Sequence, residues 1–297
     1  MRAQRDAGLS VEGSRRSPFR SVRIRAPSPW AEISVGNTCV VSSILTIGDG
    51  RVAVTFAGSG DAFGSGGRLQ ACIAVQATKQ SPILLDCGAT SLVALKRQGI
   101  HPNQVAAVMV SHLHVDHYGG LPQLILHGQF NRREAPLTIA GPPGTAERLT
   151  AALEVMFPGS STVRRHFDVN VIELQPGNDD VSIHNAVVHA IEVDHGMPGN
   201  TALGLRVDMA GKAITYTGDT AWTDVLIDLA ADSDLFIAES YYWDKAVPYH
   251  LRHADLLAHR DQLESRHIIL THMSADMLAH ADDAAFDLAY DGRVVSL

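Results

Sequence analysis

Residues 108-VMVSHLHVDHYGG-120 place four potential metal ligands directly after an apolar, strand-like run. These ligands are His112, His114, Asp116 and His117. In an extended segment, residues two apart point to the same side, so His112 and His114 should lie together. Asp116 and His117 then begin a turn into a helix that follows Gly120. One short loop can thus present ligands in two directions, which suits two metal ions a few ångströms apart.

Three later segments carry further candidate ligands, each beside or at the end of a short apolar run: 194-DHGMPG-199, 215-TYTGDT-220 and 269-ILTHMS-274. They supply His195, Asp219 and His272. A lone Gly-Asp-Thr would be an ordinary turn, but the combination is specific. Together with the first stretch, and in this order, the segments resemble the metallo-β-lactamase superfamily over roughly residues 52–297.

The resemblance implies a ligand set for two metal ions. One ion would be held by His112, His114 and His195, the other by Asp116, His117 and His272, with Asp219 bridging them. Asp116 would also orient the attacking water or accept a proton from it. Nitrogen and carboxylate ligands suit Zn²⁺, and Mn²⁺ or Fe would also accept them. We therefore expect two divalent metal ions, with zinc as the first choice.

The pattern of apolar runs favours an α/β (α+β) fold. Strand-like runs cover 51–56, 71–75, 82–86, 105–110, 136–140, 170–174, 181–193, 203–207, 213–217, 235–238 and 267–271. Helical spacing covers 89–98, 143–157, 222–232, 254–265 and 275–288. The resemblance implies a four-layer αββα sandwich of two mixed β-sheets flanked by helices. We expect one hydrolase domain over residues 36–297.

The stretch 56-FAGSGDAFGSGGRLQACIAV-75 is similar to the Gly-rich start of the ribonuclease Z-like branch of the superfamily. Two positions match a catalytic pair of that branch, Glu239 and His250. The resemblance implies that the histidine protonates the leaving oxygen and the glutamate orients it, because an alkoxide leaves far better with a proton. His253, three residues later, competes with His250 for this role. Tyr241 and Trp222 could reach the mouth of the site.

Two departures argue against a tRNA substrate. Only 23 residues lie between His195 and Asp219, where a tRNA-processing ribonuclease Z inserts a long Gly/Pro-rich arm. Residues 31–297 also carry a net charge of −13, from −8 for the chain less +5 for residues 1–30, and tRNA favours a cationic surface. We expect a phosphodiesterase acting on a small substrate. The main alternative is a hydrolase of carboxylic esters, lactones, thioesters or β-lactams on the same metals.

Two other classes of protein fit less well. A non-catalytic metal-binding scaffold would not need the complete ligand set, and an iron oxidoreductase of this fold usually replaces a histidine of the first motif by glutamate. Residues 1–35 read as a basic, disordered extension, and no apolar run reaches the ~18 residues that span a bilayer. Three cysteines cannot form a disulfide framework, which favours the cytoplasm. Monomer and homodimer both stay open.

Overall fold

The computed structural model describes residues 51–297 except 178–179, 197–198 and 200. The expected basic extension, residues 1–35, lies outside the described residues, as does the start of the expected domain. The described residues contain two seven-stranded sheets. Among them, no helix is long and apolar enough to cross a membrane.

Both sheets are mixed. The first has the order β14-β1-β2-β3-β4-β5-β6, with β1 (Val52–Gly58), β2 (Cys72–Ala77), β3 (Ile83–Leu85), β4 (Ala107–Met109), β5 (Leu137–Gly141), β6 (Val169–Glu173) and β14 (Val294–Ser296). The second has the order β13-β12-β11-β10-β9-β8-β7, with β7 (Val181–Ile183), β8 (Ala186–Val193), β9 (Ala202–Met209), β10 (Lys212–Tyr216), β11 (Leu235–Glu239), β12 (Ile268–Thr271) and β13 (Asp287–Leu288). In each sheet, antiparallel strands at one end give way to parallel strands at the other.

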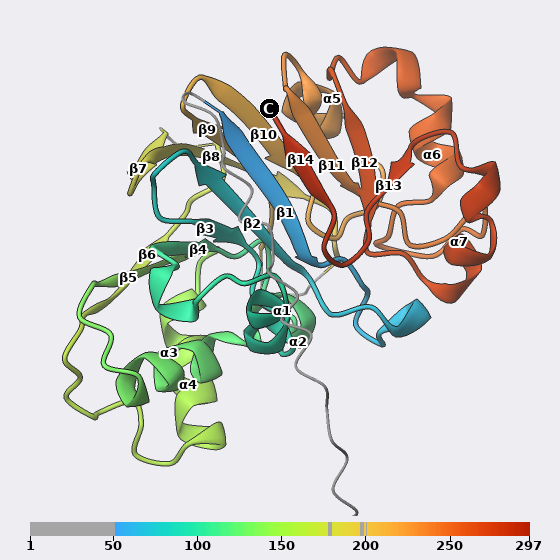
Figure 1. Ribbon diagram of the computed structural model, residues 1–297. Coiled ribbons are helices and arrows are strands. Elements are labelled where there is room, and N and C mark those ends of the chain that lie inside the picture. Colours follow the sequence, from blue (N-terminus) through green and yellow to red (C-terminus); the bar gives the residue numbers. More distant parts are fainter. Residues whose placement is uncertain (1–50, 178–179, 197–198, 200) are drawn as a thin grey trace, which may run out of the picture. The chain divides into compact units, whose positions relative to one another are not determined.

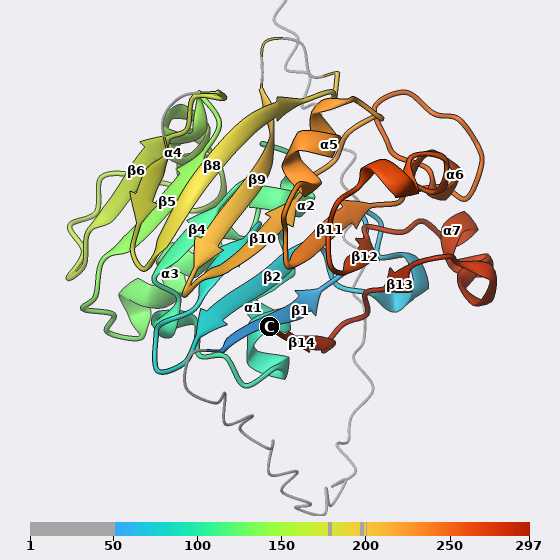
Figure 2. The ribbon, with the colours of Figure 1, turned by 90° about the horizontal axis from the view of Figure 1, so that it is seen from above.

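Helices cover the outer face of each sheet (Figure 1, Figure 2). The first sheet carries α1 (Ser91–Arg97), α2 (Val115–Tyr118), α3 (Leu121–Phe130) and α4 (Thr145–Met156), and the second carries α5 (Val225–Ala230), α6 (His253–Ala258) and α7 (Ala275–Ala279). Short 3₁₀ turns lie at Ser65–Gly67, Pro102–Gln104, Arg260–Gln262 and Ala281–Asp283. The four layers are the αββα sandwich that the sequence predicted.

Three apolar clusters hold these layers together. The central one joins inward-facing side chains of both sheets, such as Phe56 and Tyr216. A second packs helices against the first sheet, through residues such as Leu95 and Leu149. The third does the same for the second sheet, through residues such as Leu226. Central strands such as β1, β4 and β11 bury side chains on both faces, so they appear in the sequence as continuous apolar runs, whereas β8 alternates between buried and more exposed residues.

Two details of the sequence prediction were wrong. The run 181–193 is a hairpin rather than one strand, because β7 and β8 turn through His184 and Asn185, with His184 in the left-handed region at φ 56°. The stretch 275–288 is not one helix. Helix α7 ends at Ala279, a 3₁₀ turn follows, and β13 adds a parallel strand beside β12.

The topology brings chemistry-bearing residues to one edge. Strands β10, β11 and β12 run parallel, and their carboxyl ends lead to Asp219, Glu239 and His272. In the first sheet, β4 leads in the same way to the loop that begins at His112. Because the carboxyl ends of parallel strands lie at the same edge of a sheet, each sheet delivers its polar residues to one place. These two places coincide, since His117 Nε2, from the segment after β4, lies 3.2 Å from His272 Nε2, from the loop after β12.

Candidate metal centre

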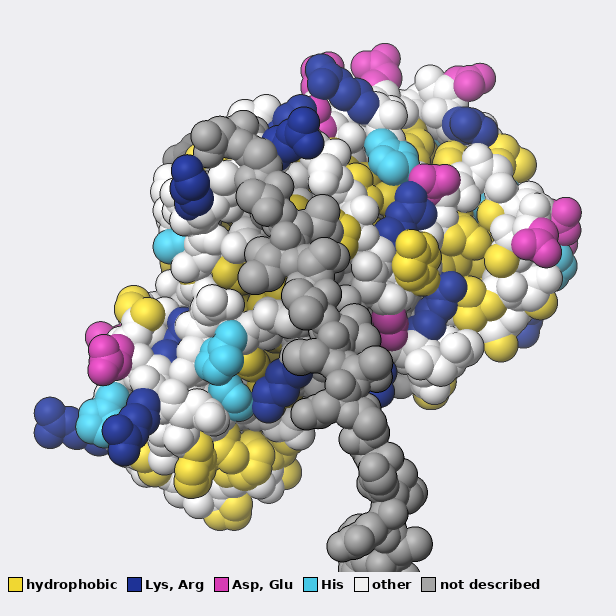
Figure 3. All heavy atoms as spheres, viewed as in Figure 1, with side chains coloured by type: hydrophobic (Ala, Val, Ile, Leu, Met, Phe, Trp, Pro, Cys, Tyr) yellow, Lys and Arg dark blue, Asp and Glu magenta, His cyan; other side chains and the backbone are white. Residues whose placement is uncertain are grey.

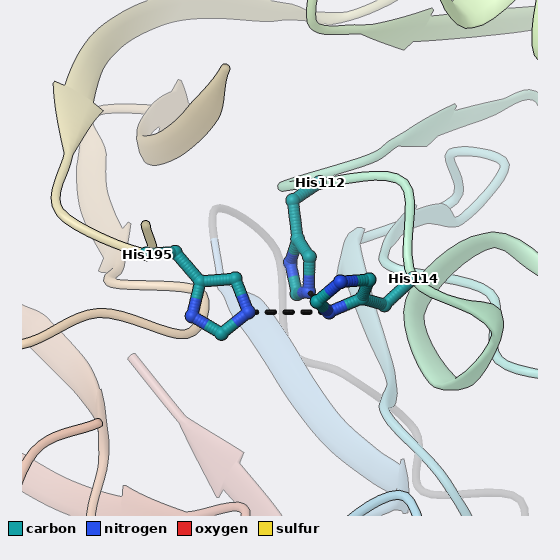
Figure 4. A group of neighbouring side chains, drawn as sticks. All are labelled: His112, His114 and His195. Atoms are coloured by element: carbon teal, nitrogen blue, oxygen red, sulfur yellow. Dashed lines mark hydrogen bonds between the residues drawn. The ribbon is translucent and has the colours of Figure 1, made fainter. Parts of the chain in front are cut away.

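Three imidazoles from both sheets converge on one point, and we call them the open group: His112, His114 and His195. His114 Nδ1 lies 3.1 Å from His112 Nε2 and 3.2 Å from His195 Nε2 (Figure 4). Ligand atoms at about 2.0–2.1 Å from a tetrahedral zinc ion lie roughly 3.3 Å apart, so this spacing suits a shared cation. His112 and His195 are buried, whereas His114 is exposed to solvent.

A second set of side chains lies beside the first, and we call it the buried group: Asp116, His117, Asp219 and His272. His117 Nε2 lies 3.2 Å from His272 Nε2 and 3.3 Å from Asp116 Oδ2. His272 Nε2 lies 3.2 Å from the same Asp116 oxygen. All four residues are buried, so this group has no solvent-exposed member.

Asp219 faces both groups with different oxygens. Its Oδ1 lies 3.3 Å from His117 Nε2 and 3.5 Å from His272 Nε2. Its Oδ2 lies 3.9 Å from His112 Nε2 and 4.0 Å from His195 Nε2. Oδ1 is buried and accepts no hydrogen bond from the described residues, which a buried carboxylate oxygen rarely tolerates without a cation. This is the arrangement required of a carboxylate that bridges two ions.

Glycine geometry makes the approach of Asp219 possible. Gly218 has φ 59°, in the left-handed region, and a Cβ there would lie 2.8 Å from the Cβ of Ser111. Only glycine fits this turn, which lets the end of β10 press against the loop from the first sheet. The Gly-Asp dipeptide of the sequence motif thus has a steric reason.

The outer nitrogens of three histidines are also held. His117 Nδ1 lies 2.7 Å from Asp86 Oδ2, His195 Nδ1 lies 2.9 Å from the carbonyl oxygen of Tyr249, and His112 Nδ1 lies 3.1 Å from Ser111 Oγ. An N–H that donates to Asp86 or to the Tyr249 carbonyl leaves the inner Nε2 lone pair free. Such outer partners fix the tautomer and the orientation of a ligating imidazole.

Asp86 is the most connected of these partners. Its carboxylate accepts hydrogen bonds from the Ser111 main-chain N–H at 2.7 Å, the Ser111 hydroxyl at 2.8 Å and the Tyr216 hydroxyl at 2.9 Å, besides its contact with His117. Its backbone is left-handed at φ 60°, and so is that of His272 at φ 57°. Strained backbone of this kind is typical of functional sites.

The electrostatics of the buried group favour a bound cation. Burial opposes ionisation of Asp219, but the neighbouring His117 and His272 hold its pKa well below the usual value. Burial lowers the pKa of His112 well below its usual value, so this imidazole is neutral and its nitrogen can ligate. Without metal, His117 and His272 compensate the buried carboxylate only as protonated imidazoles, which cannot ligate; once they are neutral, the buried charge of Asp219 needs a bound cation beside it. The residues present therefore fit divalent metal ions.

Glu239 and His250 lie directly beside this centre. Glu239 ends β11 and is fully buried, and its Oε2 accepts hydrogen bonds from the main-chain N–H of Thr220 at 2.9 Å and of Leu251 at 3.2 Å. Its Oε1 is hydrogen-bonded to His250 Nδ1. His250 Nδ1 lies 4.0 Å from Asp219 Oδ2. The pair is thus adjacent to the bridging carboxylate.

The charge on His250 is favoured by its partner. Burial would lower the pKa of His250, but the hydrogen bond to Glu239 and the Glu239 charge outweigh burial and raise it. His253, the competing candidate, is buried, and its Nε2 accepts a hydrogen bond from the Ala285 main-chain N–H at 3.0 Å. Of these two histidines, His250 is the one in contact with the centre.

The two aromatic candidates have different surroundings. The Tyr241 ring stacks on the His250 ring, with centroids 4.8 Å apart. The Trp222 ring stacks instead on the His259 ring, with centroids 3.8 Å apart. Sequence reasoning missed the roles of Ser111, Tyr216 and Tyr249. Ser111 and Tyr216 stand next to motif residues and could have been suspected, but the main-chain carbonyl of Tyr249 leaves no signal in the side-chain pattern.

Comparisons with known proteins agree with this architecture. Residues 52–293 match the family described as anti-Pycsar protein Apyc1. The chain belongs to this family. The ribonuclease Z of Lachnospira eligens is 27% identical over 275 residues, with 73% of this chain and 88% of that protein covered. The ribonuclease Z of Mycobacterium bovis is 30% identical over 198 residues, with 62% of this chain and 68% of that protein covered. The chain is therefore also placed in the ribonuclease Z-like branch of the metallo-β-lactamase superfamily.

Solved structures show the same fold. The metallo-β-lactamase fold protein YhfI from Bacillus subtilis has a TM-score of 0.68 and 20% identity, covering 83% of this chain and 99% of that one. The short form of human tRNase Z has a TM-score of 0.67 and 22% identity, covering 82% and 98%. With its relatives and its His/Asp clusters, this family member is a metal-dependent hydrolase.

Proposed function

We propose that this Apyc1-family protein is a dinuclear, zinc-dependent phosphodiesterase that acts on a small substrate. The open group would hold one ion, the buried group the other, and Asp219 would bridge them. Divalent cations there supply Lewis acidity and a water-derived nucleophile at neutral pH. The imidazole-rich ligand set supports zinc among the divalent metals.

The Glu239–His250 pair is the observation that carries the proposal. With Nδ1 engaged by Glu239, the Nε2–H of the His250 imidazolium is the proton available to a leaving oxygen. The His250 side chain is 25% exposed, so this nitrogen can meet a substrate. Esters with good leaving groups need no such acid, whereas an alkoxide leaving a phosphodiester does.

Asp116 would have a second role besides ligation. Burial raises its pKa, but His117 and His272 outweigh burial and lower it below the usual value. An ionised Asp116 accepts hydrogen bonds, so it would orient the attacking water more than it would take up its proton.

A small substrate is supported by the chain between His195 and Asp219. Most of it forms the hairpin of β9 and β10, which turns through only Ala210 and Gly211. The described part of this segment contains no long arm of the kind that the resemblance associates with tRNA processing. Lys and Arg side chains are spread over several separate places on the face in Figure 3, and residues 31–297 carry −13 charges. Both features disfavour a polyanionic RNA.

The proposal extends to the domain organisation of the chain and to its location in the cell. Residues 36–297 would form one hydrolase domain that follows a basic extension, residues 1–35. Cys72 and Cys87 are free and buried, which is in keeping with a reducing cytoplasm.

The test is a substrate panel on metal-analysed protein: bis-p-nitrophenyl phosphate, an unactivated phosphodiester such as a cyclic nucleotide, a lactone, a thioester and a precursor tRNA. His250→Ala should slow the unactivated phosphodiester by about 10²–10⁴-fold and barely affect the p-nitrophenyl ester. His189→Ala is the matched control, because this histidine pairs with Asp180 on the outside of the second sheet. Faster turnover of the lactone or thioester would favour the carboxylic-ester alternative.

A further inference from the structure

Within the described part of the chain, the His250 imidazole is hydrogen-bonded at only one atom, yet a general acid must direct a second atom at the substrate. Glu239 holds Nδ1, and this single bond leaves the ring plane free to rock about the Nδ1 contact. The proton-bearing Nε2 lies across the ring from Nδ1, so a change of plane would move it. Some other group must set the orientation of the ring.

Tyr241 provides a surface against one face of His250. The two ring centroids are 4.8 Å apart, and the planes are inclined by 29°. The ring of His195 meets His250 edge-on, with centroids 5.1 Å apart and an angle of 81°. The ring of His272 lies nearly parallel to His250 but farther away, with centroids 6.3 Å apart. His250 is therefore surrounded by Tyr241, His195, His272 and the Glu239 carboxylate, and Tyr241 is the one of these four that belongs neither to a proposed ligand set nor to the acid pair.

Tyr241 is itself held in place. Its main-chain N–H donates to the Leu251 carbonyl at 2.9 Å, and its own carbonyl accepts a hydrogen bond from the Ser274 N–H at 3.1 Å. Its ring meets Tyr242 edge-on at 4.8 Å. Tyr241 thus joins the segment that carries His250 to the loop that carries His272.

The neighbouring Trp243 anchors the same segment to α6 and α7. Its ring lies nearly parallel to His253 at 4.1 Å and to His280 at 5.0 Å. Its main-chain N–H donates to Asp276 at 3.1 Å. Tyr241 therefore stands on a backbone that is fixed from two sides, and its ring is a rigid platform.

We infer that Tyr241 is a positioning residue for the general acid: its ring holds the plane of His250 so that Nε2 keeps facing the leaving oxygen. The inference rests on the proposed function, because it needs His250 to act as the acid. The ring, rather than the hydroxyl, carries the effect. The consequence is limited to reactions in which the leaving group needs a proton.

The experiment compares two substrates on the full-length, metal-loaded protein. The readout is the ratio of kcat for an unactivated phosphodiester to kcat for bis-p-nitrophenyl phosphate. Tyr241→Leu should lower this ratio by about 3- to 10-fold, the size expected from losing one aromatic pair, with KM and metal content close to wild type. Tyr241→Phe, which keeps the ring, should restore the ratio. Tyr290→Leu, an exposed tyrosine, is the control.

A double-mutant comparison separates the inference from its premise. In a His250→Ala background, Tyr241→Leu should not lower the ratio further, because no acid is left to position. If His250→Ala lowers the ratio and Tyr241→Leu does not, Tyr241 is not a positioning residue. If Tyr241→Phe loses as much as Tyr241→Leu, the hydroxyl acts and the inference is wrong. If His250→Ala itself leaves the ratio unchanged, the proposed phosphodiesterase mechanism is wrong, and the inference is wrong with it.

Discussion

The open group consists of three histidines and the buried group of two histidines and two aspartates, and the two groups also differ in what surrounds their histidines. In the buried group, His117 is hydrogen-bonded to the Asp86 carboxylate, and every member is shielded from water. In the open group, His195 is hydrogen-bonded to the neutral main-chain carbonyl of Tyr249, and His114 is exposed. A charged outer partner raises the basicity of an imidazole more than a neutral one does. The buried group should therefore bind its ion more tightly, and the open group should exchange its ion and face the substrate.

The position of the acid pair fits this division. His250 meets the edge of His195, an open-group residue, at 5.1 Å. It also lies 4.0 Å from the Asp219 oxygen that faces the open group. A leaving oxygen protonated by His250 would thus depart on the solvent side. We therefore expect the ion of the buried group to stay bound, and the ion of the open group to exchange and to face the substrate.

The largest effect should come from removing the residue that the two groups share. Asp219→Ala takes away both bridging oxygens, so the protein should lose at least one metal ion per chain. Hydrolysis should fall by on the order of 10³-fold or more, because Lewis acidity and nucleophile generation are both impaired. Elemental analysis and the substrate panel measure this. Full activity in metal-free protein would contradict the two-ion centre.

A smaller effect should distinguish the groups. Asp86→Asn keeps the shape and tolerates the left-handed backbone at this position, but it removes the charge beside His117. The tighter of the two metal affinities should fall by about 10- to 100-fold, as expected for an outer partner, while the weaker one stays constant. Chelator competition analysed with two sites measures both. Asp180→Asn, which alters an exposed Asp–His pair, is the control.

The convergence of the candidate ligands could be predicted because their motifs follow strand ends. The two-residue spacing of His112 and His114, and the order of His195, Asp219 and His272, needed only the sequence and the family resemblance. The outer partners were harder. A main-chain carbonyl such as that of Tyr249 has no residue preference, so nothing in the letters marks it.

The fold prediction was weakest where elements are short. The run 181–193 contains a two-residue turn at His184 and Asn185, and two polar residues between apolar ones were too weak a signal to predict it. Likewise β14 has only three residues, and its place beside β1 comes from pairing across the whole length of the chain. Hydrophobic periodicity reports only local alternation along the chain, whereas the pairing of β14 with β1 is set by the packing of the two sheets.

The smallest predicted effect concerns stability, and its sign differs between the metal-free and the loaded protein. In the buried group without metal, burial would lower the pKa of His272, but Asp219 and Asp116 outweigh burial and raise it to about 10. The unfolded chain has a value of about 6.5. A raised folded-state pKa gives a stabilising contribution that is complete below about pH 6.5 and is lost as the pH rises toward about 10. The free energy of unfolding of the chelated protein should therefore fall between about pH 6.5 and 8.5.

The loaded protein should show the opposite slope, because metal binding requires unprotonated ligands and strengthens as protons leave. The open group adds no such term, since burial lowers the pKa of His112 and of His114. Urea unfolding with EDTA and with zinc, at several pH values, measures both slopes. His272→Gln should reduce the metal-free slope without abolishing it, because Asp219 and Asp86 outweigh burial and raise the pKa of His117 as well. A metal-free stability that rises over this range would show that the imidazoles of the buried group are not held protonated by the carboxylates around them.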